Sequence, residues 1–336
     1  MKFTIAPYAD RTPHSPLRSQ ADVIGRVIVP SLLFVLLCVP AFAQSGRKPP
    51  KPPAHTPQIK ADMLTLRYKP QAGTLLYVVK TQIDQSVKSD IKNYRGVLRS
   101  EAQLAFHNLA IDYKNGIWTF EEYFTKFDVA GYDLLGDSIS LDENWAVNRV
   151  MERTYNMMGD ELSKVIRDTM KLLNAEAQTN AYFFEPPRML IPLPEHPVTY
   201  GDAWSEHRID TVPVRDTINT GITSGEYTYD VQRTYHLARL LDTNGRYFAI
   251  IAATDTGVFR GFQTNSDTKV TTSASGPISG ADTTVLDLFS GCVIKRSLDM
   301  TIPAAVTVSS AASFVDALTV RSVVSLDESN ATKLKE

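Results

Sequence analysis

Cysteine is scarce in this chain, which has only Cys38 and Cys292 among its 336 residues. Cys38 lies in an N-terminal segment that we expect to be removed, so the remaining chain has a single thiol and cannot form an internal disulfide. Stability must therefore come from buried apolar surface, and the length is sufficient for one large core or two smaller ones.

The chain also lacks an excess of charge of either sign. The formal net charge is −2, with 35 basic and 37 acidic side chains spread along the chain. Binding to nucleic acid usually requires a clustered basic surface that neutralises phosphates. We therefore expect no nucleic-acid partner.

The sequence lacks the common catalytic motifs. The nearest approach to a serine-hydrolase elbow, Gly221 to Gly225, has its serine one place too late. There is no zinc-protease, phosphate-loop or dinucleotide-binding motif. We predict no catalytic residue, no metal site and no cofactor, and hence a protein that is not an enzyme.

Two groups of polar residues could suggest chemistry, but each has a simpler interpretation. His196, His207 and His236 are close in sequence, yet His236 lies on the polar phase of its strand, so we interpret them as surface histidines. Glu121 and Glu122 resemble a glycosidase pair, but neighbours on a strand point to opposite faces. They cannot act together on one substrate.

The N-terminus is typical of an exported protein. Four basic residues precede an uncharged stretch from Val27 to Val39, which ends in small residues at Ala41 and Ala43. This pattern predicts a signal peptide over residues 1–43, cut between Ala43 and Gln44. The stretch is short for a membrane anchor and contains Pro30. A lipid-modified Cys38 is disfavoured by Leu36 and Leu37, where that signal needs small residues.

Residues 44–60 are rich in proline and have little to bury, which predicts an extended tether between the processed end and the folded body. We expect the protein to be located in the periplasm, at the outer membrane or outside the cell.

From Met63 onward, apolar residues recur mostly with period two, the pattern of strands with one buried face. Clear cases are Tyr227 to Leu237, Cys292 to Ile302 and Leu318 to Leu326. The apolar phase changes between Phe106 and Ile111, which predicts a β-bulge near Asn108.

One segment has helical spacing instead. Leu162, Ile166, Met170 and Leu173 fall on one face of a helix of period 3.6, and Asp160 is placed to cap its start. The prolines that follow indicate a crossover. We therefore divide the chain into a first β half (61–140), a helical segment (141–185) and a second β half (186–330).

The two halves share an ordered set of features that indicates an internal repeat. Gly73 precedes Asn115-Gly116 by 42 positions, and Gly201 precedes Asn244-Gly245 by 43 positions. Asn-Gly is the strongest two-residue signal for a tight hairpin. We expect related halves, each containing a long hairpin at this place.

The segment from Leu193 to Trp204 contains P-x-x-P-V-x-x-G-D-x-W, with Gly201, Asp202 and Trp204 as its structural motif. It resembles a signature of uncharacterised exported bacterial β-rich proteins. More distantly, the order of strands, helix and strands is similar to periplasmic lipid carriers of the LolA and LppX type. This resemblance implies a strongly curved antiparallel sheet closed over by a helix, with Leu162, Ile166, Met170 and Leu173 lining an apolar cavity.

We therefore predict a mainly β protein (α+β) in which a strongly curved antiparallel sheet or half-barrel, built from two related halves, holds one amphipathic helix between them. The expected function is non-enzymatic binding or carrying of an apolar ligand such as a lipid. The alternative is a structural or protein-interaction module of the cell envelope. An outer-membrane barrel is disfavoured by the chain end, Lys333 to Glu336, which lacks a terminal aromatic residue. The sequence does not indicate the oligomeric state.

Overall fold

The computed structural model describes residues 63–69, 73–88, 93–132, 134, 136–140, 147, 150–167, 188–216, 223–309 and 312–327. The predicted signal peptide and tether lie outside these residues. All regular structure in the described part is β, in strands β1 (Thr74–Lys88), β2 (Asn93–Asp112), β3 (Ile117–Tyr132), β4 (Ser138–Ser140), β5 (Val150–Asn156), β6 (Glu161–Arg167), β7 (Ala203–Asp216), β8 (Thr223–Thr243), β9 (Arg246–Asn265), β10 (Thr271–Asp287), β11 (Cys292–Val308) and β12 (Ala312–Leu326).

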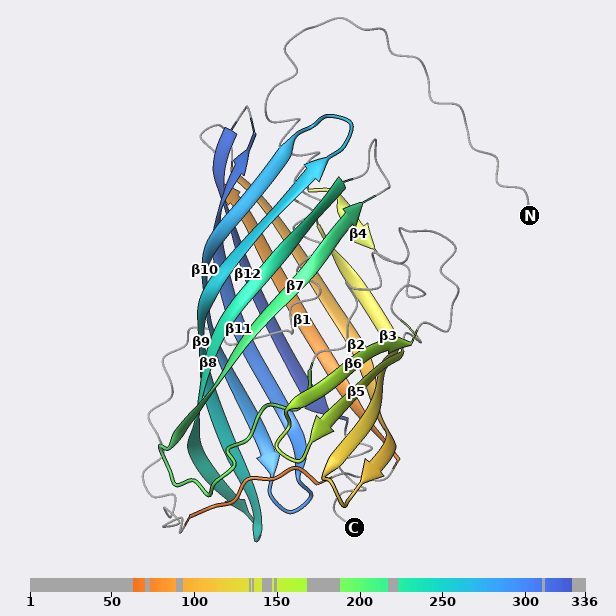
Figure 1. Cartoon of the computed structure of the whole chain (residues 1–336), viewed down its shortest axis with the longest axis vertical. Coiled ribbons are helices and arrows are strands. Elements are labelled where there is room, and N and C mark those ends of the chain that lie inside the picture. Colours follow the sequence, from red (N-terminus) through yellow and green to blue (C-terminus); the bar gives the residue numbers. More distant parts are fainter. Residues whose placement is uncertain are drawn as a thin grey trace, which may run out of the picture.

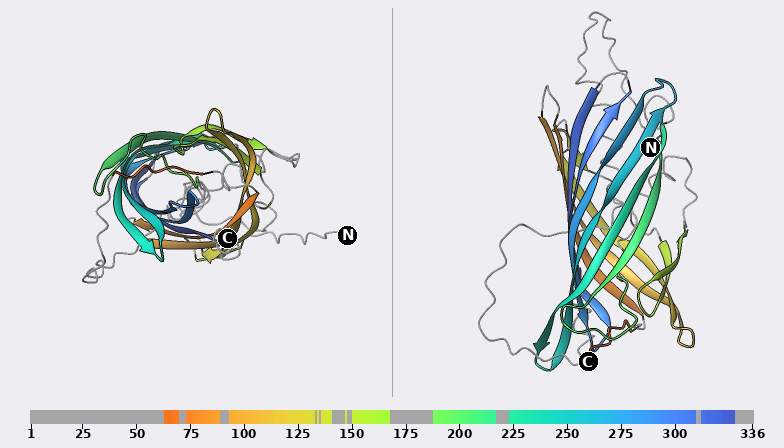
Figure 2. Two further views of the ribbon diagram at one scale, coloured as in Figure 1. Left: turned by 90° about the horizontal axis from the view of Figure 1, so that it is seen from below. Right: turned by 60° about the vertical axis from the view of Figure 1, so that its left-hand side comes forward.

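The strands form one antiparallel sheet in the order β6-β5-β3-β2-β1-β12-β11-β10-β9-β8-β7, and β4 pairs with β3. Long strands of up to 21 residues curl the sheet strongly, and an end view shows them around a ring (Figures 1 and 2). The two ends of the order, β6 and β7, are not paired with each other, so the sheet is not closed. The predicted strongly curved antiparallel sheet is confirmed.

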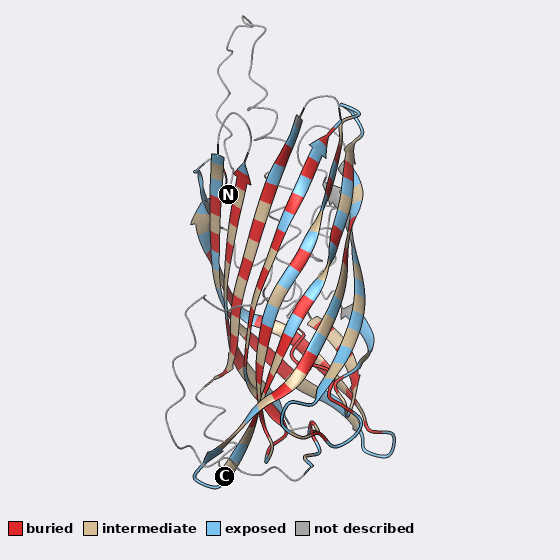
Figure 3. Ribbon diagram, turned by 90° about the vertical axis from the view of Figure 1, so that its left-hand side faces the viewer, coloured by how far each residue is buried: buried red, intermediate tan, exposed pale blue. Residues whose placement is uncertain are grey.

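Period-two patterning gives the sheet one buried and one polar face. Buried and exposed residues alternate along the strands in Figure 3, and Tyr227, Tyr235 and Leu298 are among the buried ones, as predicted. Residues of the opposite phase, such as Lys295 and Thr301, are exposed or half-buried. The outward face also carries exposed apolar side chains, among them Val258, Phe262 and Val315, so the alternation is one of burial more than of polarity.

Local irregularities also follow the sequence. The register of β2 against β3 shifts between Asn108 and Ala110, which confirms the predicted bulge. Both Asn-Gly pairs lie in hairpin turns. Asn115-Gly116 is the second half of a four-residue turn, 113–116, between β2 and β3, whereas Asn244-Gly245 alone joins β8 to β9 as the predicted tight turn. Asn244 (φ 56°) and Gly245 (φ 79°) adopt the left-handed conformation that a two-residue turn requires.

A second register shift, between Leu237 and Arg239 of β8, lies as far before its Asn-Gly turn as the first shift lies before the other turn. A duplicated three-strand unit would produce this match between β1–β3 and β7–β9. The two related halves nevertheless stay a prediction, because the match is one of arrangement.

The predicted amphipathic helix is wrong over its first half. Leu162 and Ile166 lie on β6, which pairs with β5, and Leu162 is 53% exposed. Asp160 does not cap a helix, since its backbone accepts a hydrogen bond from Asn156 N across the β5–β6 turn. Leu162 and Ile166, four positions apart, share a face in a helix and also in a strand, and pairing with β5 decides between the two. Met170 and Leu173 lie outside the described residues.

Two non-strand segments cross the interior at the lower end of Figure 1. Residues 63–69 and 188–198 pair through a bridge between Leu64 and Val198. Met189, Leu190, Ile191 and Leu193 are buried. Together, the two segments form what we call the plug. The described part of the chain contains no helix, and hence none long and apolar enough to cross a membrane.

Candidate functional site

An aromatic wall lines the concave face beside the plug. It is built from β1, β2 and β3, whose inward positions hold Tyr77, Phe106, Trp118 and Phe120. The rings of Phe106 and Phe120 stack with centroids 4.2 Å apart, and Trp118 meets Phe120 edge to face at 6.4 Å. Because each ring is fixed by a neighbour, the wall is a rigid apolar surface.

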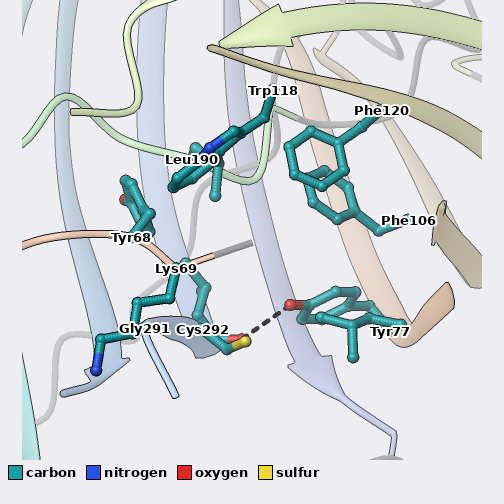
Figure 4. Close-up of a pocket in the computed structure, with 11 residues that line it drawn as sticks. Tyr68, Lys69, Tyr77, Phe106, Trp118, Phe120, Leu190, Gly291 and Cys292 are labelled. Atoms are coloured by element: carbon teal, nitrogen blue, oxygen red, sulfur yellow. Dashed lines mark hydrogen bonds between the residues drawn. The ribbon is translucent and has the colours of Figure 1, made fainter. Parts of the chain in front are cut away.

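The plug and β11 enclose a cavity against this wall. Its other lining residues include Tyr68 and Leu190 from the plug and Cys292 and Val293 from β11 (Figure 4). The cavity volume is about 30 Å³. That volume holds a water molecule or two but no larger molecule unless a side chain moves.

The two tyrosine hydroxyls at the cavity are already hydrogen-bonded. Tyr77 donates its hydroxyl proton to the Val293 carbonyl at 3.1 Å. Tyr68 donates to the Ile191 carbonyl and accepts from the Ile191 amide, both at 3.0 Å. Burial raises the pKa of both phenols well above the ordinary value. The cavity therefore presents apolar surface, which suits an apolar ligand.

Cys292 lines the cavity from β11 as a thiol. Burial raises its pKa to about 11, and the sulfur approaches the Ser290 carbonyl at 3.8 Å. A nucleophilic cysteine needs a lowered pKa. Cys292 therefore serves as a small apolar lining residue.

Gly291 sets the floor of the cavity by allowing the plug to come close. Its φ is +67°, and a Cβ at this position would lie 2.4 Å from the backbone nitrogen of Lys69. In return, Lys69 N donates to the Gly291 carbonyl and Lys69 Nζ to the Phe289 carbonyl, at 3.3 and 2.8 Å. Only glycine fits this turn without displacing the plug.

Buried ion pairs run across the concave face under the plug. Arg233 of β8 holds Asp255 of β9 through two hydrogen bonds of 2.5 and 2.7 Å. Arg296 of β11 binds Asp282 of β10 at 2.6 and 2.9 Å. Arg296 also donates to the Arg188 carbonyl in the plug.

A further pair fastens the plug to the edge strand β7. Arg188 binds Glu206 at 2.5 Å and donates to the Gly159 carbonyl at 3.0 Å. Tyr235 donates to the other oxygen of Glu206 at 3.0 Å. Burial alone would raise the pKa of Glu206, but the Arg188 guanidinium lowers it, so the carboxylate stays charged.

The predicted structural motif lies at this junction. Gly201 has φ +91°, and Asp202 accepts a hydrogen bond from Thr199 N at 2.8 Å, so the two residues form the turn before β7. Trp204 donates its indole proton to the Pro192 carbonyl at 2.8 Å and stacks on Tyr235. The motif therefore docks the plug on the sheet.

Of the predicted cavity-lining residues, Leu162 is 53% exposed on β6, and the backbone of Ile166 pairs with Met151 of β5. Trp118 and Phe120 of β3 line the cavity.

The other polar residues are not brought together. Glu122 is buried against Arg153 and Tyr155, whereas Glu121 belongs to the opposite phase. His207 contacts Asp230, at 2.7 Å. No group of three or more potential metal ligands occurs among the described residues.

The sequence interpretation missed the charged residues of the concave face. Arg233 and Arg296 stand on the apolar phase of β8 and β11, between Val231 and Tyr235 and between Ile294 and Leu298. A charge on a buried phase demands a partner. An arginine at a buried position of a strand is visible in the sequence, although the sequence does not identify which carboxylates pair with it.

No protein-family model matches the chain, and no curated protein sequence matches it. Among solved structures, the fold comparison aligns OccK5 (OpdH) of Pseudomonas aeruginosa at 7% identity, covering 76% of this chain and 98% of that chain, with a TM-score of 0.21. Salmonella typhi OmpF in complex with daunomycin aligns at 8% identity over 76% of this chain and 97% of that chain, with a TM-score of 0.23. A BenF-like porin from Pseudomonas fluorescens Pf-5 aligns at 6% identity over 76% of this chain and 98% of that chain, with a TM-score of 0.21. These TM-scores are too low to indicate anything about function.

Proposed function

We propose that this chain is a non-enzymatic binding protein of the cell envelope that takes an apolar group between the aromatic wall and the plug. One observation carries the proposal: a cavity enclosed by Tyr77, Phe106, Trp118, Phe120 and Leu190, in which the nearby hydroxyls are bonded to backbone. A ligand there gains mainly from apolar contact. The charged residue that lines the cavity, Lys69, is exposed, and its ammonium donates to the Phe289 carbonyl.

The size of the cavity defines how the ligand enters. At about 30 Å³, the cavity is closed to a hydrocarbon chain until a lining side chain moves. Leu190 is the natural candidate, since it belongs to the plug and not to the sheet. An alkyl chain or a single ring, which can replace one leucine side chain, fits this requirement better than a bulky rigid molecule.

Binding without catalysis agrees with the state of the buried ionisable groups. Asp255 and Asp282 are each held by an arginine, and the thiol of Cys292 has a raised pKa. Neither a free general base nor an activated nucleophile is offered to the cavity. Location in the envelope rests on the predicted signal peptide, and the similarity to lipid carriers stays a prediction.

Tryptophan fluorescence offers a direct test. Trp118 lines the cavity, whereas Trp204 stacks on Tyr235 and does not line it. The chain has a third tryptophan, Trp145, outside the described residues, so the test uses a Trp145→Phe background. In that background, dodecanoic acid should change the emission of a Trp204→Phe variant, whose one tryptophan is Trp118. The matched Trp118→Phe variant in the same background should bind the same ligand without that change.

Stability gives the second readout. A ligand that binds only the folded state at a hundred times its Kd stabilises by about 2.7 kcal/mol, a rise in melting temperature that is easily measured. Absence of both the emission change and the thermal shift would reject the cavity proposal. The remaining interpretation would then be the structural or interaction module.

A further inference from the structure

The plugged end of the sheet presents exposed aromatic side chains on its turns. Tyr113 (78% exposed) follows β2, Tyr200 (71%) precedes β7 and Phe289 (74%) lies between β10 and β11. Tyr247, at the start of β9, is also exposed. The β2–β3, β8–β9 and β10–β11 turns and the start of β7 lie at the lower end of Figure 1, which Figure 2 views from below.

An aspartate braces each of the three most exposed positions. The Asp112 carboxylate accepts hydrogen bonds from Lys114 N and Asn115 N, both at 3.1 Å. Asp287 accepts from Phe289 N at 3.0 Å and from the Ser290 hydroxyl at 2.6 Å. The Asp202 bond to Thr199 N closes the turn that contains Tyr200. Because these turns are already ordered, inserting their aromatic residues costs little conformational entropy.

The turns that carry Tyr113, Tyr200 and Phe289 present separate aromatic side chains and not one continuous patch. They belong to different strand pairs along the sheet order, with β1 and β12 between the β2–β3 and β10–β11 turns. A deformable surface can meet such points together, whereas a rigid protein partner would need a matching set of pockets. Amphipathic tyrosine at a water boundary is typical of residues that lie at the headgroup level of a bilayer.

Charged side chains of both signs lie at these turns. Asp112 is accompanied by Lys114, and Asp287 is paired with Arg246, whereas Asp202 and Asp242 add acidic groups. Charges of both signs suit zwitterionic headgroups better than a surface of one sign would. Met63, the first described residue, lies at this same end, because Leu64 next to it pairs with Val198.

We propose that this end of the molecule docks on the headgroup region of a phospholipid bilayer through Tyr113, Tyr200 and Phe289. The docking does not depend on a ligand in the cavity. It places the plug, and the cavity behind it, against the lipid surface.

Vesicle sedimentation tests the docking. The chain without residues 1–43 is mixed with vesicles of equal parts phosphatidylcholine and phosphatidylethanolamine. We expect the parent protein to sediment with the vesicles, and a combined Tyr113→Ser, Tyr200→Ser and Phe289→Ser variant to bind at least tenfold more weakly. The matched control is Tyr132→Ser, which removes a 60% exposed tyrosine at the other end of β3 and should bind like the parent.

Other outcomes overturn the proposal. Absence of sedimentation of the parent protein, or equal binding by the combined variant, would do so. Self-association of the parent in light scattering that the combined variant loses would assign these turns to a second copy instead. Binding that requires anionic phosphatidylglycerol would assign it to charge. The fatty-acid response of Trp118 should be the same in the combined variant, so failure of docking and failure of the cavity proposal are distinguishable.

Discussion

Arg296→Met is the most informative single substitution, because Arg296 joins the sheet to the plug. Its side chain is 6% exposed, and its partner Asp282 is 1% exposed. Methionine keeps most of the apolar stem but leaves Asp282 without its strongest partner. Breaking a buried ion pair from one side costs about 3–5 kcal/mol, and losing the bond to the Arg188 carbonyl adds about 1 kcal/mol.

A second substitution separates the cost of the unpaired Asp282 carboxylate from the cost of the lost hydrogen bond to the Arg188 carbonyl. In Arg296→Met combined with Asp282→Leu, no unpaired carboxylate remains, and Arg233 retains Asp255. The cost should fall to about 1–3 kcal/mol, mainly from the unsatisfied Arg188 carbonyl. Urea unfolding followed by tryptophan fluorescence measures both free energies of unfolding.

The control is Arg321→Met on β12, whose side chain is 43% exposed and whose ion pairs to Asp84 and Asp299 are 3.4 and 3.5 Å long. It should change the free energy of unfolding by less than about 1 kcal/mol. The reasoning is refuted if Arg296→Met costs no more than Arg321→Met, or if adding Asp282→Leu increases the loss.

Three further changes test the plug and the buried groups. Gly291→Ala should cost at least about 2 kcal/mol, whereas Gly245→Ala, with φ +79° and nothing within 4 Å of its new Cβ, should cost about 1 kcal/mol; equal losses in thermal unfolding would contradict the close approach to Lys69. Asp316 is buried and its pKa is raised to about 6, so its contribution to stability is fully present below its unfolded pKa and is lost as pH rises through 6. Asp316→Asn should therefore stabilise by up to ~3 kcal/mol at pH 7.5 and leave stability unchanged at pH 3, and destabilisation at pH 7.5 would reject this account. Cys292, with a pKa of about 11, should react with a thiol reagent at pH 8 at least ~100-fold more slowly in the folded protein than in urea, and equal rates would show that the wall is open.

Much of the sheet could be predicted because a strand with one buried face has apolar and polar residues in alternation. The alternation around Tyr227 and Leu298 specified inward faces, and Asn244-Gly245 specified a tight turn through backbone conformation. The bulge at Asn108 could be predicted because the apolar residues stand at even positions before it and at odd positions after it. Each of these signals is local.

The misassigned and missed features depend on distant partners. Leu162 and Ile166 fit a helix as well as a strand, and only pairing with β5 distinguishes the two. The cavity combines Tyr68, Trp118 and Cys292, which are far apart in sequence, so no spacing connects them. Arg296 could be recognised as a buried charge, but its partners lie on β10 and in the plug.

Native mass spectrometry of the chain without residues 1–43, mixed with dodecanoic acid, tests the central claim most directly. If an apolar group enters between the aromatic wall and Leu190, the spectrum should contain one bound molecule per chain, and a Leu190→Ala variant, whose cavity is larger, should retain it at lower ligand concentration. A spectrum with only the bare chain for both proteins, at every ligand concentration, would contradict the claim.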